Sequence, residues 1–482
     1  MSATWSQMYA AHAGSPRPAV VSAHGVWSYS ELTERAGGWA AWYDAHDLAP
    51  GTTLPALLGS TPSAYALLLA GAFTGRPLAP LSDRLTPTEL AACLRELRAP
   101  VLLVAEQARG LGRAVADQIG CRLVALPEIP GQRGALPLDA PDDQPALVLH
   151  TSGTSGRPKP VRFEQRRLGA RVRVYGELLG LADGDIFSSS QQFHHLGGAG
   201  LLAVALAVGA AVAPPTTRFT VESWRALGRL GATHATLAPT MMEMLLAHGE
   251  LHQPTLRLLI YGSSPIRPDT AARVIADFPG LGLFQGYSQT EGGPITALTP
   301  VGHRRAVAQA PHLLRSVGQA VPGLELRIDE PDAAGVGEVC ARADHLAVSG
   351  ADGWLHTGDM GRLDGDGYLY LAGRRRDMII RGGENVYPDE VERRLQTHPA
   401  VRDVAVVGQR HEVYGEEVVA FVVPADPAAP PDPDELRAFA RLELSGFKVP
   451  TSWQLVDELP RGALGKVLRR RLRAAPSPEG TA

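Results

Sequence analysis

The chain has 482 residues, of which 45% are apolar and 20% are charged, and its formal net charge is -4. One hydrophobic core seldom serves so long a chain, so we expect at least two domains. The small net charge gives no reason to expect nucleic acid or an anionic membrane as a partner. The cysteines Cys93, Cys121 and Cys340 lie far apart without CxxC spacing, and the start lacks the basic and apolar regions of a signal peptide. Both features favour reduced thiols in a cytoplasmic protein.

One apolar stretch is long enough to span a bilayer. Leu196–Pro215 contains twenty residues without a charge. Alanine and glycine dominate it, however, and two prolines close it. A buried helix that runs into a core strand explains this stretch better than a membrane span, so we expect a soluble protein with no membrane span. The oligomeric state does not follow from the sequence.

Short apolar runs alternate with helical patterns from Val20 to Ile328, which predicts an α/β domain with largely parallel sheets. The predicted strands include Leu54–Leu58, Val101–Val104, Ala146–His150 and Leu256–Tyr261. The predicted helices include Ser63–Phe73, Pro87–Arg98 and Trp224–Leu230.

A short β-rich part follows from Gly335, with a hairpin turn at Asp364–Gly367. A compact α+β region comes next. Its predicted elements are a helix at Pro388–Gln396, strands at Val401–Val407 and Glu417–Val423, and a helix at Asp434–Leu444. We therefore predict a large N-terminal domain over 1–372, a hinge at 373–377 and a small C-terminal domain over 378–482.

A glycine- and hydroxyl-rich loop directly follows the predicted strand Ala146–His150. It reads Thr151-Ser152-Gly153-Thr154-Ser155-Gly156-Arg157-Pro158-Lys159. Its glycines allow close backbone approach to an anion, its hydroxyls and amides can donate to phosphate oxygens, and Lys159 adds a positive charge. A polar surface loop is the alternative. The spacing differs from GxxxxGK[ST], which disfavours a kinase, an enzyme that would release ADP rather than AMP.

This loop resembles the phosphate loop of the adenylate-forming superfamily, which includes acyl-CoA synthetases, peptide-synthetase adenylation domains and luciferases. Further segments resemble the family's motifs in the same order, so the resemblance covers nearly the whole chain. They are Trp27–Leu32, Gly286–Glu291, His356–Asp359, Gly373–Asp377 and Gly465–Lys466. Two residues depart from the family pattern, because Pro160 and Ser288 stand where the family usually has glycine.

The resemblance implies ATP-dependent activation of a carboxylic acid to an acyl-adenylate, with Mg²⁺ and release of pyrophosphate. Glu291 would bind Mg²⁺, which prefers oxygen ligands, and Thr290 would donate to the α-phosphate. Alternatively, Glu291 lies in the first turn of a helix and only favours its dipole. Further residues would contact the nucleotide: Gly286 and Tyr287 beside the adenine, Gly262, Ser263 and Ser264 along its edge, Asp359 at the ribose, and Arg374 at the ribose or a phosphate. Asp359 and Arg374 could instead form a purely structural ion pair.

The resemblance assigns the C-terminal domain a moving role. Lys466 would bridge the incoming carboxylate and the α-phosphate, and rotation about Asp377 would then withdraw it. The same rotation would bring Gly383 and its neighbours to the site, where glycine leaves room for the pantetheine arm of coenzyme A. A solvated lysine and an ordinary glycine turn are the alternatives.

Two segments narrow the choice of acceptor and the class of acid. Arg381–Pro388 resembles the version of its motif found in acyl- and aryl-CoA ligases. No carboxylate occurs between Ser188 and Thr217, where adenylation domains for amino acids hold an ammonium group. His194 would lie between the acyl pocket and the thiol channel. Alternatively it is a packed core histidine, or His195 takes its role.

The residues expected around the acid are mostly small or apolar, which predicts a hydrophobic aromatic or medium-chain acid. They are Phe193–Gly200, Ala238–Thr240, Tyr261–Ser264, Gly286–Gln289 and Gly292–Pro294. Coenzyme A is the expected co-substrate. A carrier-protein thiol, an amine or another nitrogen nucleophile remains open as the acceptor, and so does a non-catalytic nucleotide-binding regulator.

Overall fold

The computed structural model describes residues 3–126, 133–151, 159–214, 219–262, 266–381, 384–411, 413–462 and 467–474. The chain groups into two compact units. The first comprises 1–326, 341–355 and 365–369, and the second comprises 327–340, 356–364 and 370–482. The predicted domain limits and the hinge at 373–377 stay predictions.

The first unit contains a six-stranded sheet in which every neighbouring pair is parallel except the last, β7 with β8. In spatial order its strands are β6 (Arg122–Ala125), β5 (Val101–Val104), β3 (Leu54–Leu57), β4 (Leu78–Leu81), β7 (Pro145–Thr151) and β8 (Lys159–Glu164). The helices α3 (Pro62–Phe73), α4 (Pro87–Leu97) and α5 (Arg109–Ile119) connect its strands. Parallel strands require such crossovers, as the alternating pattern predicted.

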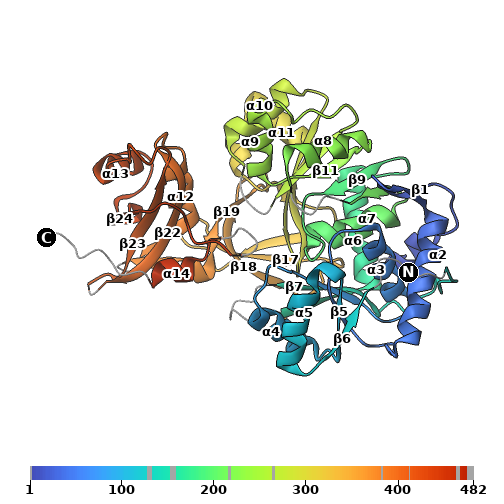
Figure 1. Ribbon diagram of the computed structural model, residues 1–482. Coiled ribbons are helices and arrows are strands. Elements are labelled where there is room, and N and C mark those ends of the chain that lie inside the picture. The colour runs from blue at the N-terminus through green and yellow to red at the C-terminus, as the bar shows by residue number, and fades with distance from the viewer. Residues whose placement is uncertain are drawn as a thin grey trace. The chain divides into compact units, whose positions relative to one another are not determined.

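A nine-stranded sheet forms the other layer of the first unit, parallel from β1 through β13 and antiparallel at both edges. Its strands in spatial order are β15 (Gln319–Ala320), β14 (Gly293–Leu298), β13 (Gly282–Gln289), β12 (Leu258–Gly262), β11 (His234–Thr236), β9 (Ile186–Ser189), β10 (Ala211–Ala213), β1 (Pro18–Ser22) and β2 (Gly25–Ser28). The associated helices are α1 (Trp5–Ala10), α2 (Tyr29–Ala45), α6 (Gln165–Leu179), α7 (Leu201–Ala207), α8 (Val221–Arg229), α9 (Pro239–Ala247), α10 (Pro268–Asp277) and α11 (Pro300–Gln309). Figure 1 shows α8 to α11 gathered beside β11.

Two smaller sheets follow along the chain. The four-stranded one has the order β16 (Glu325–Asp329), β17 (Gly337–Arg342), β18 (Leu355–Leu363) and β19 (Leu369–Arg374). The five-stranded one has the order β21 (Glu384–Val386), β20 (Ile379–Arg381), β23 (Gly415–Pro424) and β22 (Val401–His411), with β24 (Ser452–Leu455) paired to β23. The helices α12 (Pro388–Gln396), α13 (Pro433–Arg441) and α14 (Arg469–Arg473) surround the five-stranded sheet (Figure 1).

Hydroxyl side chains begin several helices of the first unit. Thr61 and Thr86 each accept a backbone N–H bond at the start of α3 and α4, and each precedes a proline in the first helical position. Ser28 and Glu31 form a reciprocal capping box at the start of α2. Such caps satisfy N–H groups that have no partner inside the helix. The motif Trp27–Leu32 therefore has a structural explanation in this chain.

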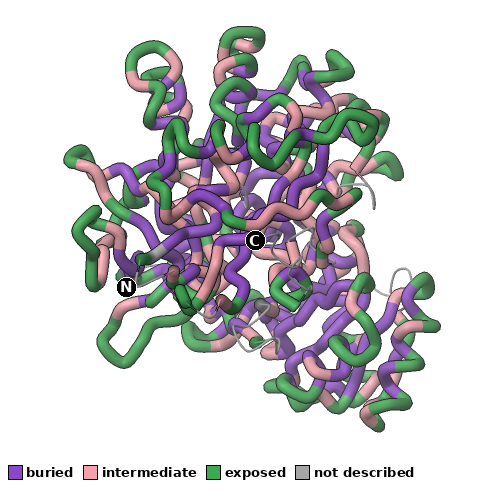
Figure 2. Tube along the Cα trace, turned by 90° about the vertical axis from the view of Figure 1, so that its left-hand side faces the viewer, coloured by how far each residue is buried: buried purple, intermediate pink, exposed green. Residues whose placement is uncertain are grey.

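The core of the first unit holds a cluster of aromatic side chains that anchors the N-terminal helix. Trp5 and Tyr9 of α1 are fully buried, and their rings lie within 6 Å of Phe73. The Trp5 Nε1–H donates to Ala203 O at 2.9 Å, so the polar end of the indole is satisfied. Buried parts of the trace lie in the interior of each unit, and exposed parts lie at its surface (Figure 2).

Most of the described part of the uncharged stretch Leu196–Pro215 is buried, as predicted. It forms a π-helical turn (Leu196–Gly200), then α7, then β10, and every residue of α7 and β10 is buried. No helix among the described residues combines the length and hydropathy that crossing a bilayer requires.

The α/β fold class with its largely parallel sheets, β-rich part and small C-terminal region is confirmed, and most predicted elements are found within two residues. Val101–Val104 and Pro388–Gln396 match the structure fully. Three predictions missed a boundary by more: α8 begins at Val221 because Thr220 caps it, α13 ends at Arg441, three residues early, and β22 continues to His411, four residues past the predicted end of the strand. The three cysteines carry no disulfide.

Two buried histidines link the stability of the first unit to pH. His303 donates from Nδ1 to Thr299 O at 3.0 Å and accepts at Nε2 from the Tyr261 hydroxyl at 2.8 Å. His345 donates from Nε2 to Pro294 O at 2.8 Å. Burial lowers the pKa of each to about 4, so both imidazoles are neutral in the folded chain at neutral pH.

We expect the melting temperature to fall as the pH falls from about 6.5 towards about 4. In that window the unfolded chain binds protons at both histidines and the folded chain does not. Each histidine contributes a slope of up to about 1.4 kcal/mol per pH unit. Thermal unfolding at several pH values checks this. A double variant, His303→Gln with His345→Gln, should have a flatter profile, and an unchanged slope would contradict the assignment.

Candidate functional site

The predicted nucleotide-binding residues of the first unit gather where β12 and β13 end. The two strands run parallel, and Gly262 lies opposite Gly286. A Cβ on Gly262 would lie 2.7 Å from Gly286 O, so this close approach requires glycine. Tyr287 follows directly and packs against the core of the unit. Gly286 and Tyr287 are therefore held by strand pairing, at the end of the sheet where the sequence predicts the base.

Thr290 and Glu291 lie in the turn that connects β13 to β14. The strands on both sides pair antiparallel, with Gln289 opposite Gly293 and a bulge between Tyr287 and Ser288. Glu291 thus lies in a strand-to-strand turn, and the alternative that places it in the first turn of a helix is wrong. A β-bulge changes the direction in which the following side chains point, so the bulge between Tyr287 and Ser288 affects the orientation of the turn that follows.

A second segment of the first unit holds this turn in place. Glu291 O accepts the N–H groups of Ala347 and Val348 at 2.9 and 3.2 Å. His345 donates to Pro294 O from the same segment. The backbone of the turn is therefore fixed from outside its own two strands.

The Glu291 side chain fits the predicted role of a magnesium ligand. It is half-buried, and none of the described residues hydrogen-bonds its carboxylate. A carboxylate with free oxygens on a fixed backbone is the type of ligand that Mg²⁺ takes. Its role as metal ligand stays a prediction.

The predicted phosphate loop is described only at its two ends. Thr151 ends β7 and lies opposite Lys159, the exposed first residue of β8. Antiparallel pairing of these residues brings both ends of the loop together. The loop residues between them that were predicted to bind phosphate lie outside the described residues, and they are Ser152, Gly153, Thr154, Ser155 and Gly156. Four other predicted positions also lie outside the described residues: Ser263, Ser264, Gly383 and Lys466.

His194 is largely enclosed, directly before the π-helical turn. Its ring centroid lies 4.3 Å from that of His195, and its buried Nε2 has no hydrogen-bond partner among the described residues. Burial, with smaller contributions from His195 and Arg84, lowers the pKa of His194 to about 3. The imidazole is therefore neutral at neutral pH, and it can orient a substrate by a hydrogen bond but not by charge.

Asp359 and Arg374 lie together in the second unit. Arg374 Nε donates to Asp359 Oδ1 at 2.9 Å, and Asp359 is only 6% exposed. Gly358, at a φ of +69°, turns the chain, and Thr357 Oγ1 accepts the Asp359 N–H at 3.1 Å. The ion pair that sequence reasoning considered as an alternative exists. Whether Asp359 also accepts from the ribose hydroxyls stays a prediction.

The surroundings of Lys466 are described on both sides of its loop. Arg461 and Val467 form an antiparallel bridge, and Leu468 N donates to Pro460 O at 2.7 Å. The helix α14 follows at once, and its Arg469 donates to Asp389 and Glu392 at 3.0 and 2.7 Å. Burial raises the pKa of Glu392 to about 7. The loop is thus closed at its base and tied to α12.

The predicted hinge residue is tied to the same helix. Asp377 lies in a short 3₁₀ turn (Arg375–Asp377), and its Oδ1 accepts from Arg473 of α14 at 3.2 Å. The ionic contacts of α14 therefore reach from α12 to the residue about which the sequence predicts rotation.

Another group of possible metal ligands lies in the second unit. One ligand atom from each of Asp329, Cys340 and His356 lies within 4.8 Å of the others. Burial raises the pKa of Cys340 to about 11, and Arg375 donates to the adjacent Glu338 at 3.0 Å. Arg375 already neutralises the carboxylate next to this group, and no further observation points to an ion here, so we assign no metal to it.

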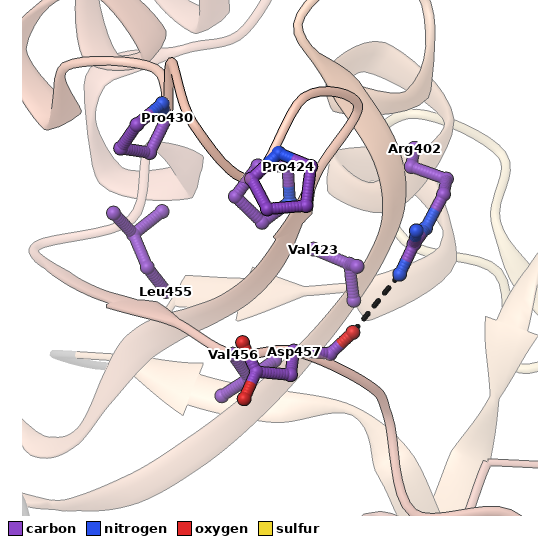
Figure 3. Close-up of a pocket in the computed structure, with 8 residues that line it drawn as sticks. Arg402, Val423, Pro424, Pro430, Leu455, Val456 and Asp457 are labelled. Carbon is purple, nitrogen blue, oxygen red and sulfur yellow. Dashed lines mark hydrogen bonds between the residues drawn. The ribbon is translucent and has the colours of Figure 1, made fainter.

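A surface hollow of about 240 Å³ lies beside the proline-rich loop of the C-terminal region (Figure 3). Pro424, Pro430 and Leu455 form part of its wall, and Arg402 donates to Asp457 O at 2.9 Å. None of the predicted site residues lines it, so it does not correspond to the nucleotide site.

Sequence reasoning missed two residues of α6 that contact the strands and turn of β13 and β14, where the predicted metal ligand lies. Arg171 is fully buried against Gly293, and Tyr175, one helical turn further on, hydrogen-bonds with Ser288. Nothing in the sequence separates Arg171 from the exposed arginines near it, because only packing decides which side of the helix faces the turn.

These features define an ATP-binding ligase of the adenylate-forming type, with a carboxylate-bearing turn at the end of a parallel sheet and a separately packed C-terminal region. Residues 8–348 match the AMP-binding enzyme family, and residues 390–466 match the AMP-binding enzyme C-terminal domain. The chain belongs to the AMP-binding enzyme family.

Three similar proteins differ in the acceptor that their names state. The fatty acid–[acyl-carrier-protein] ligase ScoC of Streptomyces coeruleorubidus is 31% identical over 95% of this chain and 93% of its own. The amide bond synthetase McbA of Marinactinospora thermotolerans has a TM-score of 0.84 at 29% identity, covering 97% and 98% of the two chains. The o-succinylbenzoate coenzyme A synthetase of Bacillus subtilis, solved with ATP and a magnesium ion, has a TM-score of 0.85 at 25% identity, covering 97% and 99%.

The prediction that Asp359 binds the ribose has a direct test. Asp359→Asn removes the charge that strengthens hydrogen bonds from the ribose hydroxyls, so we expect the KM for ATP to rise about ten- to a hundredfold. Carboxylate-dependent exchange of labelled pyrophosphate into ATP measures it. Asp364→Asn, at the turn after the same strand, should leave the KM near its original value. If the Asp359 variant does so too, the ion pair with Arg374 is only structural.

Proposed function

We propose that this enzyme activates a hydrophobic carboxylic acid, aromatic or of medium chain length, and transfers its acyl group to coenzyme A. In the first step a carboxylate oxygen attacks the α-phosphorus of ATP, forming acyl-AMP and releasing pyrophosphate. In the second step the coenzyme A thiolate attacks the acyl carbonyl, forming the thioester and releasing AMP.

The observation that carries this proposal is the Glu291 carboxylate on its fixed turn. Two anions must meet for the first step, and a bound magnesium ion neutralises the phosphates. Glu291 would hold the metal while Thr290, its neighbour, donates to the α-phosphate. The N–H groups of Ala347 and Val348 donate to Glu291 O and so hold the backbone of Glu291 and its neighbour Thr290 in place. Charged groups that are held in place before the reaction stabilise the transition state without having to rearrange.

The distribution of lysine supports the same chemistry. The sequence contains only three lysines among its 46 basic residues. Lys448 forms an ion pair with Glu390 at 2.8 Å, and the other two are Lys159 and Lys466. In a chain that otherwise uses arginine, two lysines stand at the positions where the family's reaction uses a compact, mobile charge.

Two features favour coenzyme A over other acceptors. The segment Arg381–Pro388 resembles the motif of acyl- and aryl-CoA ligases, and no acidic residue between Ser188 and Thr217 would hold the ammonium of an amino acid. His194, neutral and without a hydrogen-bond partner among the described residues, would orient the substrate carboxylate or the thiol. The similarity to ScoC supports a carrier-protein thiol as the second candidate, and the similarity to McbA supports an amine as the third.

A panel of acids tests the proposal. Purified protein with ATP, Mg²⁺ and each acid should exchange labelled pyrophosphate into ATP, and adding coenzyme A should convert the adenylate to thioester with release of AMP. Exchange without thioester, followed by acyl transfer to a carrier protein or an amine, would replace coenzyme A as the acceptor. Absence of exchange with every acid would refute carboxylate activation by this chain.

Substituting the predicted bridging lysine separates the two steps. Lys466→Ala should lower the rate of adenylate formation by about 10² to 10³, because a charge that acts only in the transition state is lost. Thioester formation from supplied acyl-adenylate should fall far less. Lys448→Ala, which removes the lysine paired with Glu390, is the matched control. An equal loss in both steps would contradict a role confined to the first.

A further inference from the structure

The inner side of α6 carries a buried arginine with two unpaired donor groups. Arg171 is 1% exposed. Its Nε donates to His345 O at 2.8 Å, and its guanidinium carbon lies 4.4 Å from the centre of the Phe163 ring. Nη1 and Nη2 are both buried and have no hydrogen-bond partner within the described parts of the chain.

Such an arrangement is energetically unfavourable unless something binds to it. A buried charged group whose donors lack partners destabilises a fold, because it has lost its hydrogen bonds to water without replacing them. Burial lowers the pKa of Arg171 to about 10, so the side chain still carries its charge at neutral pH. Its two Nη groups are therefore available to an acceptor that the chain itself does not supply.

Arg171 lies next to the turn between β13 and β14, which carries Thr290 and Glu291. A Cβ on Gly293 would lie 2.8 Å from Arg171 Nε and 3.2 Å from Nη2, so the guanidinium packs directly against the end of that turn. The charge of Glu291, in the same turn, acts on Arg171. Arg171 therefore lies behind the residues that the sequence predicts to bind the metal and the α-phosphate.

The neighbouring side chain extends this polar layer. Tyr175 lies four residues after Arg171, hence on the same side of α6, and it hydrogen-bonds with Ser288. Ser288 replaces the glycine that the family usually has. The two α6 residues thus contact both segments, Gly286–Gln289 and Gly292–Pro294, that the sequence predicts around the acid.

We propose that the acid activated by this enzyme carries a second oxygen acceptor, a carboxylate or a carbonyl, which binds to Nη1 and Nη2 of Arg171. This inference rests on the proposed function. It adds a polar end to an acid whose body is apolar, and the planar guanidinium suits such an acceptor because it offers two parallel N–H groups. The acceptor that binds Arg171 is not the carboxylate that reacts, because the reacting carboxylate must lie beside the phosphates of ATP.

Arg171 does not act chiefly as an ionic partner of Glu291. No described contact joins the guanidinium to the Glu291 carboxylate within ion-pair distance, and both Nη atoms would be occupied if it did. A positioning role would also affect every acid equally. Recognition of a second acceptor affects only the acids that carry one, and this difference can be measured.

The test compares matched acids. One series consists of 3-phenylpropanoic acid, its 4-acetyl derivative and its 4-carboxy derivative, and the other of unsubstituted, oxo- and dicarboxylic straight-chain acids of equal length. The readout is kcat/KM in pyrophosphate exchange. In the wild-type enzyme we expect an acceptor-bearing acid to exceed its unsubstituted counterpart by about tenfold or more. The carbonyl and carboxylate members of each series tell which acceptor is preferred.

Arg171→Met should abolish this preference, mainly by raising KM for the acceptor-bearing acid. Its melting temperature should not fall, because loss of the bond to His345 O is offset by removal of a buried, unpaired charge. Arg171→Lys keeps the charge without the planar pair of donors and should retain part of the preference; it replaces the Met variant if that variant does not fold. Arg173→Met, on the exposed side of the same helix, is the control and should keep the wild-type ratio.

The outcomes separate this inference from the proposed function. If no acid in either series or in the wider panel supports exchange, carboxylate activation itself fails. If acids support exchange but the wild-type enzyme does not prefer an acceptor, recognition by Arg171 is refuted while the proposed function stands. The same holds if Arg171→Met lowers exchange equally for every acid, a result that would make Arg171 a positioning residue for the turn between β13 and β14.

Discussion

The structure depends on one constraint, which is that the turn between β13 and β14 keeps a single position. Its backbone is held from two directions: by pairing of the strands on either side, and by the N–H groups of Ala347 and Val348, which bind Glu291 O. A carboxylate that binds a metal between anions has to be placed before the substrates arrive, because reorganisation during the reaction would cost much of the electrostatic gain. Gly262 contributes to the same arrangement, since only glycine permits its close approach to the carbonyl oxygen of Gly286.

The charged residues discussed above differ in how firmly their backbones are held. Glu291 lies in the turn between two paired strands, and Arg171 lies on a packed helix. Lys466 belongs to a loop closed at its base by the bridge between Arg461 and Val467. Withdrawal of Lys466 after the first step stays a prediction.

Arg171 adds a charged side chain next to segments that the sequence predicts around the acid. The sequence predicts small and apolar residues around the acid, and the segments that it names are of that kind. The structure adds Arg171 and Tyr175 behind two of these segments, from a helix that does not belong to any motif. Specificity in this chain can therefore reside in a residue outside the motifs that define its chemistry. The three similar proteins share the fold, but their names state different acceptors. This is consistent with one set of residues determining the chemistry and another determining the specificity.

The sequence by itself determined the family, the α/β class and most of the elements. These follow from local signals, such as the capping residues Thr61 and Thr86, the alternation of apolar runs, and motifs whose residue types the chemistry requires. Tertiary structure alone decided which side chains meet. That Glu291 lies in a strand-to-strand turn depends on the pairing of β13 with β14. That His194 is buried and neutral, and that Arg171 rather than Arg173 faces this turn, depends on packing between segments distant in the chain. No local pattern encodes such contacts, because burial and hydrogen-bond satisfaction are properties of the assembled fold.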